Sequence, residues 1–315
     1  MAIWYEGNLN IPENRREENG VTYFVRGVRE VDGVRYERYA VKTHFIGRGE
    51  DMEAVLRQYV LPLYQQGDIV TLGEKVISMC QDNTVEMKDV KLGFWAKFLS
   101  RFATHNQNGI GMDEPYKLQL AINMKGLPLI LWASFCGAVC KLFGKRGVFY
   151  QIVGQDVAGI DGFYSHSAFE VYHTLAVLNP REPDKVCSDI YEKLGISCVL
   201  VDANDIDVEV LGCSPDLMQR TREQLADLIR DNPAGQDDEL TPFVIVRDIG
   251  EREAQPYVPV KALDQPPAEG IRAESAEAPV QEKASQNAEE SPTMQIQASA
   301  ENGKEDGSDA PAEQA

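Results

Sequence analysis

The sequence predicts an α/β fold of mixed α+β character, in which mixed sheets are flanked by helices and a disordered acidic tail follows. The first observation is a hairpin signal, because residues 21–28 and 34–46 are rich in β-branched and aromatic residues and Asp32-Gly33 lies between them. The second is a nearly all-apolar run at 241–246, which is typical of a strand in the interior of a sheet. The third is that 43% of the 315 residues are hydrophobic, enough to bury a sizeable core.

Between the hairpin and the last strand, helical and extended patterns alternate, which favours an α/β or α+β domain. Asp51 is placed to cap a helix over 52–65, and a short apolar strand is expected at 69–72. Aromatic residues at helical spacing predict a helix over 91–102, and an apolar run at 148–153 predicts a further strand.

The most apolar run of the chain is residues 127–139, downstream of a helix start with Asp113 as the expected cap and Pro115 in the first turn. The run is 13 residues long, whereas a membrane-spanning helix needs about 20. A membrane span is therefore disfavoured, and a buried helix or a strand–helix pair is expected. A membrane-dipping segment or a peripheral membrane contact through this run is the weaker alternative.

The charge of the chain is strongly negative and unevenly distributed. Of the formal net charge of −19, residues 251–315 contribute −9, with 14 Asp and Glu against 5 Lys and Arg. This segment is also rich in proline and buries too little apolar surface to offset its ordering entropy. We therefore expect an irregular lead over 1–20, one α/β domain over 21–250 and a disordered tail over 251–315. The acidic balance argues against a nucleic-acid partner, because phosphate contacts need clustered Lys and Arg.

The cysteines and the N-terminus indicate a cytoplasmic protein. None of the six cysteines belongs to a CxxC pair, which favours reduced thiols over a disulfide framework or a zinc site. The first 20 residues lack the basic and then apolar pattern of a signal peptide.

Two acidic turns between residues 153 and 207 are the strongest candidate for a functional site. One contains Gly159-Ile160-Asp161, and in the other an apolar strand at 197–201 ends on Asp202. Carboxylates at the ends of apolar runs suit hard cations such as magnesium and manganese. From the residues alone, Asp161 also fits an ordinary turn aspartate, and Asp202 also fits a helix or turn cap.

This region resembles the coenzyme F-420-0:L-glutamate (gamma-glutamyl) ligase family. Residues 157–161 (VAGID) look like the family's Asn-Ala-Gly-Ile-Asp turn. Residues 178–184 (LNPREPD) look like its Pro-x-x-Pro-Asp segment, and residues 199–204 (VLVDAN) are similar to its apolar strand with a terminal aspartate. Weaker similarities lie at 67–78 and 241–247.

The family joins glutamate to a phospholactyl-deazaflavin through an amide, using GTP and a divalent metal. The resemblance therefore implies a gamma-glutamyl ligase-like core, GTP as co-substrate, manganese or magnesium as cofactor, a small-molecule carboxylate or amino acid as a further ligand, and a homodimer. Carried over by position, Asp161 and Asp202 would be metal ligands, and Gln236 would be a third.

Further side chains are candidates for nucleotide or substrate contacts. Asn204 could orient a carboxylate or phosphate, Asp205 could add a ligand, and His166 could contact phosphate. Lys42 and His44 occupy the family's segment before the first helix and could touch nucleotide. Each of these residues also fits an ordinary loop or a solvated strand end, and no catalytic residue is assigned.

The chain departs from the family pattern in ways that bear on its substrate. Ala203, Asp205 and Ile206 stand where the family has Thr, Gly and Arg, and the segment 78–82 lacks the family's lysine. Because triphosphates normally need cationic or N–H donors, these departures favour a divergent paralogue with a different acceptor. The alternative is a non-catalytic ligand-binding or scaffolding relative that kept the fold.

Overall fold

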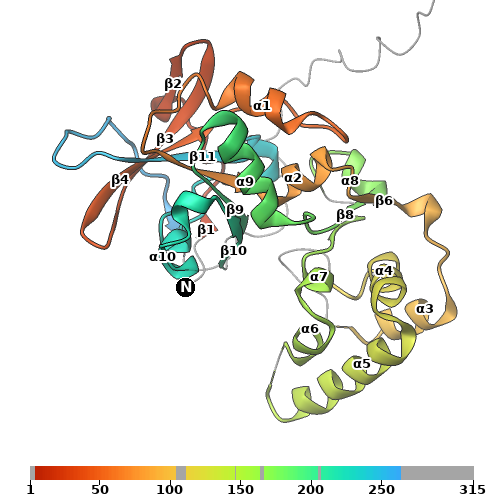
Figure 1. Cartoon of the computed structure of the whole chain (residues 1–315). Helices are drawn as coiled ribbons and strands as arrows, with labels where there is room; N and C mark the ends of the chain where they lie inside the picture. Colours follow the sequence, from red (N-terminus) through yellow and green to blue (C-terminus); the bar gives the residue numbers. More distant parts are fainter. Residues whose placement is uncertain (1–3, 104–110, 146, 164–166, 205–206, 264–315) are drawn as a thin grey trace, which may run out of the picture. The chain divides into compact units, whose positions relative to one another are not determined.

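A computed structural model describes residues 4–103, 111–145, 147–163, 167–204 and 207–263 (Figure 1). Its main element is a seven-stranded mixed sheet flanked by helices, as the α/β class expected from the sequence requires. The strands are ordered β10 (Val208–Cys213), β9 (Cys198–Ala203), β5 (Ile69–Gly73), β11 (Phe243–Asp248), β4 (Val34–Val41), β3 (Val21–Val31) and β2 (Arg15–Glu18).

The predicted hairpin is confirmed as β3 and β4, which pair antiparallel from Val31 opposite Val34. Asp32 and Gly33 join them with φ angles of 52° and 77°. Two consecutive residues with positive φ make the turn whose twist matches that of the flanking strands, and Asp-Gly adopts it at low cost.

The predicted interior strand is β11, which lies between β5 and β4 and is antiparallel to both. Its first four residues are fully buried, as expected for a strand covered on both faces. On the other side of β5 the pairing is parallel, with Gly73 of β5 opposite Val201 of β9. Because the two strands run in the same direction, the chain leaves both of them at the same edge of the sheet.

Helices bury apolar side chains against both faces of this sheet. On one face, Leu56 of α1 (Met52–Tyr59) and Ile190 of α9 (Pro183–Leu194) join a core that includes Phe243. On the other, Leu225 of α10 (Arg222–Asp227) joins a core that includes Val246. The predicted cap of α1 is confirmed, because the Asp51 side chain accepts a hydrogen bond from the Glu53 backbone N–H at 2.9 Å.

A second core lies among short helices and a small sheet of β6 (Thr84–Glu86), β8 (Leu175–Val177) and β7 (Asp161–Gly162). The predicted helix at 91–102 is confirmed as α3 (Phe94–Ser100). The apolar run forms the helix α5 (Leu127–Leu142), but not the buried helix that was expected, because only Ile130 and Ala133 are buried in it. The strand expected at 148–153 is wrong, since these residues form the helix α6 (Val148–Val153); periodicity alone does not separate a short apolar strand from a buried helix.

The remaining short elements complete the described part of the chain. The other helices are α2 (Glu74–Cys80), α4 (Pro115–Lys125), α7 (Gln155–Ala158) and α8 (Val171–Thr174), and the 3-10 turns are Pro12–Asn14, Met87–Asp89, Pro215–Leu217 and Asp237–Glu239.

The cap of α4 differs from the expectation. Glu114, and not Asp113, accepts the hydrogen bond from the Lys117 backbone N–H, at 2.9 Å. Pro115 occupies the first turn as predicted, because its missing N–H costs nothing there.

The two ends of the α/β domain need correction. The irregular lead contains β2, which pairs with β3, and β1 (Trp4–Tyr5). The expected tail starts too early, because β12 (Ala262–Leu263) pairs with β1. The ring of Tyr257 also lies where a side chain on Gly27 would be. Residues 264–315, most of the predicted tail, are outside the described part.

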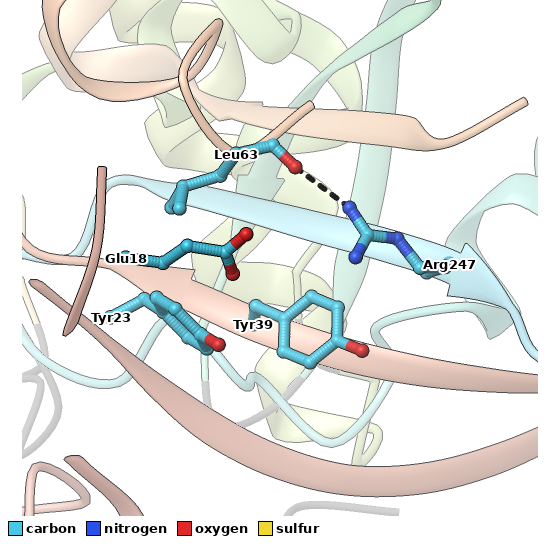
Figure 2. Close-up of a pocket in the computed structure, with 5 residues that line it drawn as sticks. All are labelled: Glu18, Tyr23, Tyr39, Leu63 and Arg247. Atoms are coloured by element: carbon cyan, nitrogen blue, oxygen red, sulfur yellow. Dashed lines mark hydrogen bonds between the residues drawn. The ribbon is translucent and has the colours of Figure 1, made fainter. Parts of the chain in front are cut away.

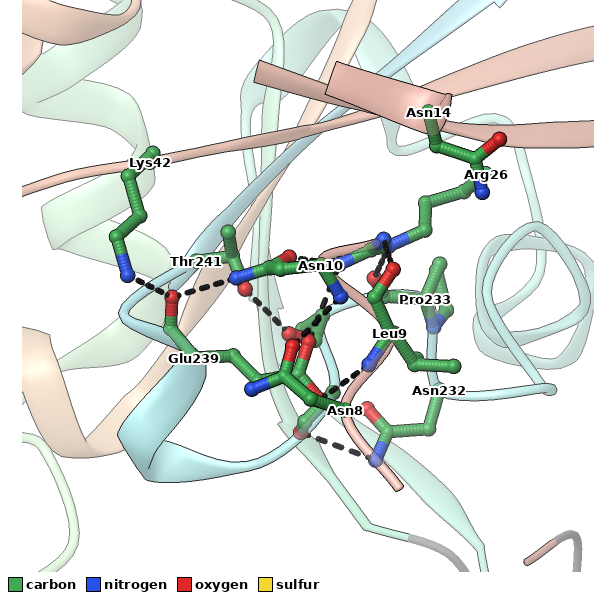
Figure 3. Close-up of polar contacts among 12 residues, drawn as sticks. Asn8, Leu9, Asn10, Asn14, Arg26, Lys42, Asn232, Pro233, Glu239 and Thr241 are labelled. Atoms are coloured by element: carbon green, nitrogen blue, oxygen red, sulfur yellow. Dashed lines mark hydrogen bonds and ion pairs between the residues drawn. The ribbon is translucent and has the colours of Figure 1, made fainter. Parts of the chain in front are cut away.

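A buried ion pair ties the lead to the loop before β11 (Figure 3). Arg26 of β3 and Glu239 lie 3.3 Å apart and are almost fully buried. Glu239 also accepts a hydrogen bond from the Leu9 backbone N–H at 3.0 Å. Burial, only partly offset by these partners, raises the pKa of Glu239 to about 7.

This pKa predicts a pH-dependent stability. A carboxyl whose folded pKa lies above its unfolded value stabilises the fold at low pH, and the contribution is lost as pH rises through the folded pKa. Between pH 4.5 and 8 the wild type should lose on the order of 3 kcal/mol of unfolding free energy relative to Glu239→Gln. Urea unfolding across this range measures it, and Glu251→Gln on an exposed side chain is the matched control. A Glu239→Gln variant with the wild-type pH slope would contradict the assignment.

Candidate functional site

The candidate site lies where the parallel strands β5 and β9 end. Gly73, the last residue of β5, is followed by Glu74 and Lys75 in the first turn of α2. Asp202 is the residue after Val201, which pairs with Gly73. Ligand sites of open α/β sheets form at this edge, outside the carboxyl ends of parallel strands.

Lys75 is the centre of the site. Its ammonium pairs with Asp161 and with Asp237, the latter at 2.6 Å, and lies 5.1 Å from the centre of the Tyr172 ring. Burial would lower the pKa of Lys75, but the two carboxylates outweigh it and raise this pKa well above its ordinary value. Lys75 therefore stays charged and supplies the positive charge of the site.

The carboxyl groups around Lys75 fall into two electrostatic classes. Burial would raise the pKa of Asp161, but contact with Lys75 outweighs it and holds this pKa below its usual value. The pKa values of Glu74 and Asp202 are raised, first by burial and then by neighbouring carboxylates, including Asp161. Pairs of carboxyl groups with opposite shifts are typical of sites that hold charge and move protons.

Glu74 carries an unsatisfied oxygen. Its Oε2 atom is buried and finds no hydrogen-bond partner within the described part of the chain. Such an atom costs free energy unless a proton, a cation or another donor meets it. Together with the acidic neighbours, this points to a ligand or a proton at Glu74.

Two glycines place Asp161. Asp161 and Gly162 form β7, opposite Val177 and Ala176 of β8. Gly162 has φ 140°, and a Cβ there would overlap the β8 backbone. A Cβ on Gly159 would overlap the side chain of Asn179. The Gly-Ile-Asp-Gly sequence is therefore what lets this turn approach β8.

The structure brings some of the predicted residues together. Asp161 and Asp202 lie close enough for Asp161 to raise the pKa of Asp202, and Asn204 hydrogen-bonds to the Asp202 side chain. Gln236 directly precedes Asp237, a partner of Lys75.

Other predicted residues have different surroundings. Lys42 donates to the backbone oxygen of Glu239 at 2.6 Å, and burial lowers its pKa. The partners of the His44 ring are Tyr59 and Glu50, both at 2.8 Å, and not the side chains around Lys75. His166 and Asp205 lie outside the described residues.

Sequence reasoning missed four residues of this site: Glu74, Lys75, Tyr172 and Asp237. The signal for Glu74 and Lys75 was their position directly after an apolar strand, but it becomes informative only once that strand is known to run parallel to β9. Asp237 stands beside Gln236 in an acidic loop, where nothing distinguishes one carboxylate from the next.

The donor chemistry of the site fits a hard divalent cation, because Asp161, Asp202 and Glu74 offer carboxylate oxygens. The arrangement of these carboxylates does not by itself form a metal site. Within the described ranges, no three His, Cys, Asp or Glu side chains are grouped as ligands of one metal ion. Asp161 instead faces the Lys75 ammonium.

Two cavities elsewhere do not overlap this site. The one drawn in Figure 2, between Glu18, Tyr39 and Arg247, holds about 10 Å³, on the order of one water molecule. A larger one of about 350 Å³ is lined by residues of α1, α2 and α9, including Cys80 and Asp189. Neither is lined by Lys75 or by the carboxyl groups around it.

No model of a known protein family matches the chain, and no curated protein matches it either. The resemblance to the gamma-glutamyl ligases therefore stays an expectation from the sequence motifs.

The raised pKa of Glu74 predicts the effect of neutralising it. Glu74→Gln should raise the unfolding free energy at pH 8 by on the order of 1 kcal/mol, because it removes a carboxyl group whose ionisation is favoured in the unfolded chain and opposed by burial in the folded one. The gain should disappear near pH 4, where the wild-type side chain is protonated, since the folded pKa lies above the unfolded one. Chemical unfolding at both pH values measures this. Glu192→Gln, on an exposed position of α9, controls for the loss of charge; a destabilised Glu74→Gln at pH 8 would refute the assignment.

Proposed function

We propose that the chain is a metal-dependent amide ligase of the gamma-glutamyl type that uses a nucleoside triphosphate. The reaction centre is the group around Lys75. The observation that carries the proposal is that Asp161 and Asp202, which the family resemblance selects as metal ligands, lie in one electrostatically coupled group with Glu74 and Lys75.

In this proposal Asp161 and Asp202 would hold the metal, with the side-chain oxygen of Gln236 as a further donor. When bound, the metal would supply charge neutralisation for the triphosphate and polarisation of its terminal phosphoryl group. Lys75 exchanges a carboxylate partner for a phosphate oxygen, as lysines at phosphate sites do.

The reaction has two steps. A carboxylate oxygen of the acceptor attacks the terminal phosphorus, and the bond to the leaving nucleoside diphosphate breaks. The amine nitrogen of glutamate, or of a related amino acid, then attacks the acyl carbon and displaces phosphate. Its proton passes to Glu74, whose pKa is raised and whose buried Oε2 atom finds no hydrogen-bond partner within the described part of the chain.

A second candidate is a non-catalytic ligand-binding relative. The observation that favours it is that Lys75 engages both Asp161 and Asp237, which leaves these carboxylates neutralised by the protein itself. Such a protein would bind an anionic ligand through Lys75 without turnover.

Calorimetric binding of GTP and ATP, each with and without manganese, separates these functions. The ligase requires manganese-dependent nucleotide binding, and Asp161→Asn and Asp202→Asn should each weaken it about tenfold or more. Asp189→Asn, an exposed carboxylate on α9, is the matched control and should bind as the wild type does. Binding without metal that is lost in Lys75→Met but kept in both aspartate variants would favour the non-catalytic relative. Failure of the folded protein to bind either nucleotide would refute the ligase proposal.

A further inference from the structure

Helix α5 exposes an apolar stripe that the proposed ligase function does not use. Trp132, Phe135, Val139 and Leu142 follow one another at helical spacing, with 59%, 61%, 36% and 85% of their surfaces exposed. The opposite side of α5 packs into the protein through the buried Ile130 and Ala133. Large apolar side chains exposed in a row are rare on a free surface and mark contact sites.

Helix α3 carries a second exposed aromatic group. Phe94 and Phe98 stack with ring centres 5.8 Å apart, and Phe102 lies 5.2 Å from Phe98. Trp95 contacts both Phe94 and Phe98. Ala96 and Ser100, on the other side of α3, are buried. Each of the two helices thus has one side in the protein and one aromatic side facing outward.

The charge of this part of the chain is opposite to that of the rest. Residues 87–154, here called the helical lobe, contain nine Lys and Arg against three Asp and Glu, a net charge of +6. All other residues together carry −25. Exposed cations flank the aromatic side chains on both helices: Lys97 and Arg101 beside α3, and Lys141 and Lys145 beside the end of α5.

The geometry does not suit a transmembrane arrangement. Helix α5 has 16 residues, which extend about 24 Å, whereas the hydrocarbon core of a bilayer is about 30 Å thick. Among the described residues, no single helix has the length and apolar composition to cross a membrane; α4 and α5 reach them only as a pair, bent by 120°. Leu118, Leu120 and Ala121 of α4 are buried in the protein's own core, so they are not available to lipid.

We propose that the helical lobe docks on the surface of a bilayer rich in anionic lipid, with the outer sides of α5 and α3 in the interface. Aromatic rings beside Lys and Arg are the composition that favours the headgroup region. The negative surface attracts the basic lobe and repels the acidic remainder of the chain, so the charge also orients the molecule. This proposal does not depend on the ligase function.

Flotation of the full-length protein with vesicles tests the proposal. The protein should float with phosphatidylcholine vesicles that contain phosphatidylglycerol, remain at the bottom with phosphatidylcholine alone, and be released by high salt. Trp132→Glu/Phe135→Glu and, separately, Lys141→Glu/Lys145→Glu should each reduce the vesicle-bound fraction about tenfold, because one removes the apolar anchor and the other the charge attraction.

Met218→Glu is the matched control. Met218 is an apolar residue with 68% of its surface exposed, outside the helical lobe, and its substitution should leave flotation unchanged. Circular dichroism and urea unfolding establish that each variant is folded. If the folded wild type does not float with anionic vesicles, the proposal is wrong. Light scattering then tests the other occupant of this face. A dimer that Trp132→Glu/Phe135→Glu dissociates, together with an absence of flotation, would show that a second copy of the chain covers α5 and would also refute the proposal.

Discussion

The parallel pairing of β5 with β9 is the constraint on which the candidate site depends. It sets Gly73 opposite Val201, so Lys75, just after the end of β5, and Asp202, near the end of β9, lie at one edge of the sheet. Several acidic groups can gather there because Lys75 keeps its charge, with Lys117 as a second cation acting on Asp161: without positive charge, burial and mutual repulsion would protonate the carboxyl groups or separate them. A backbone pairing and these cations together make the site possible.

The distribution of charge gives the same chain two different surfaces. Acidic groups concentrate at the ends of the strands, where a cation or a phosphate–metal complex would be held, while the helical lobe is basic and aromatic. A uniform excess of acid would only keep the chain soluble and away from polyanions. Here Trp132 and Lys141 lie on the same helix, so apolar and electrostatic attraction act on the same partner.

The sequence predicts what depends on neighbours along the chain and misses what depends on distant pairing. The Asp32-Gly33 hairpin and the Asp51 cap are local, and both are confirmed. The pairing of β1 with β12 joins segments almost a whole domain apart and leaves no local pattern. Strand β2, in the expected irregular lead, pairs with the adjacent β3 and was missed although its pairing is local. Asp161 and Asp202 are candidates from their acidic turns and from the family resemblance, whereas the position of Lys75 becomes informative only when β9 is known to be the parallel neighbour of β5. A short apolar run such as 148–153 carries too little periodicity to separate a helix from a strand.

The loop before β11 couples the fold and the site through two neighbouring carboxylates. Glu239 turns inward to Arg26 and holds the N-terminal lead, while Asp237, two positions earlier, turns outward to Lys75. Gly235 must remain glycine, because it has φ 76° and a Cβ there would overlap the Glu239 carboxylate. Asp237 and Glu239 belong to one 3-10 turn, so a change that displaces the backbone at Glu239 is expected to move Asp237 away from Lys75. The Lys75 ammonium would then pair with Asp161 without Asp237, and the balance of charge around Glu74 and Asp202 would change. The buried Arg26–Glu239 pair would in this way affect the chemistry of the site without contacting a ligand.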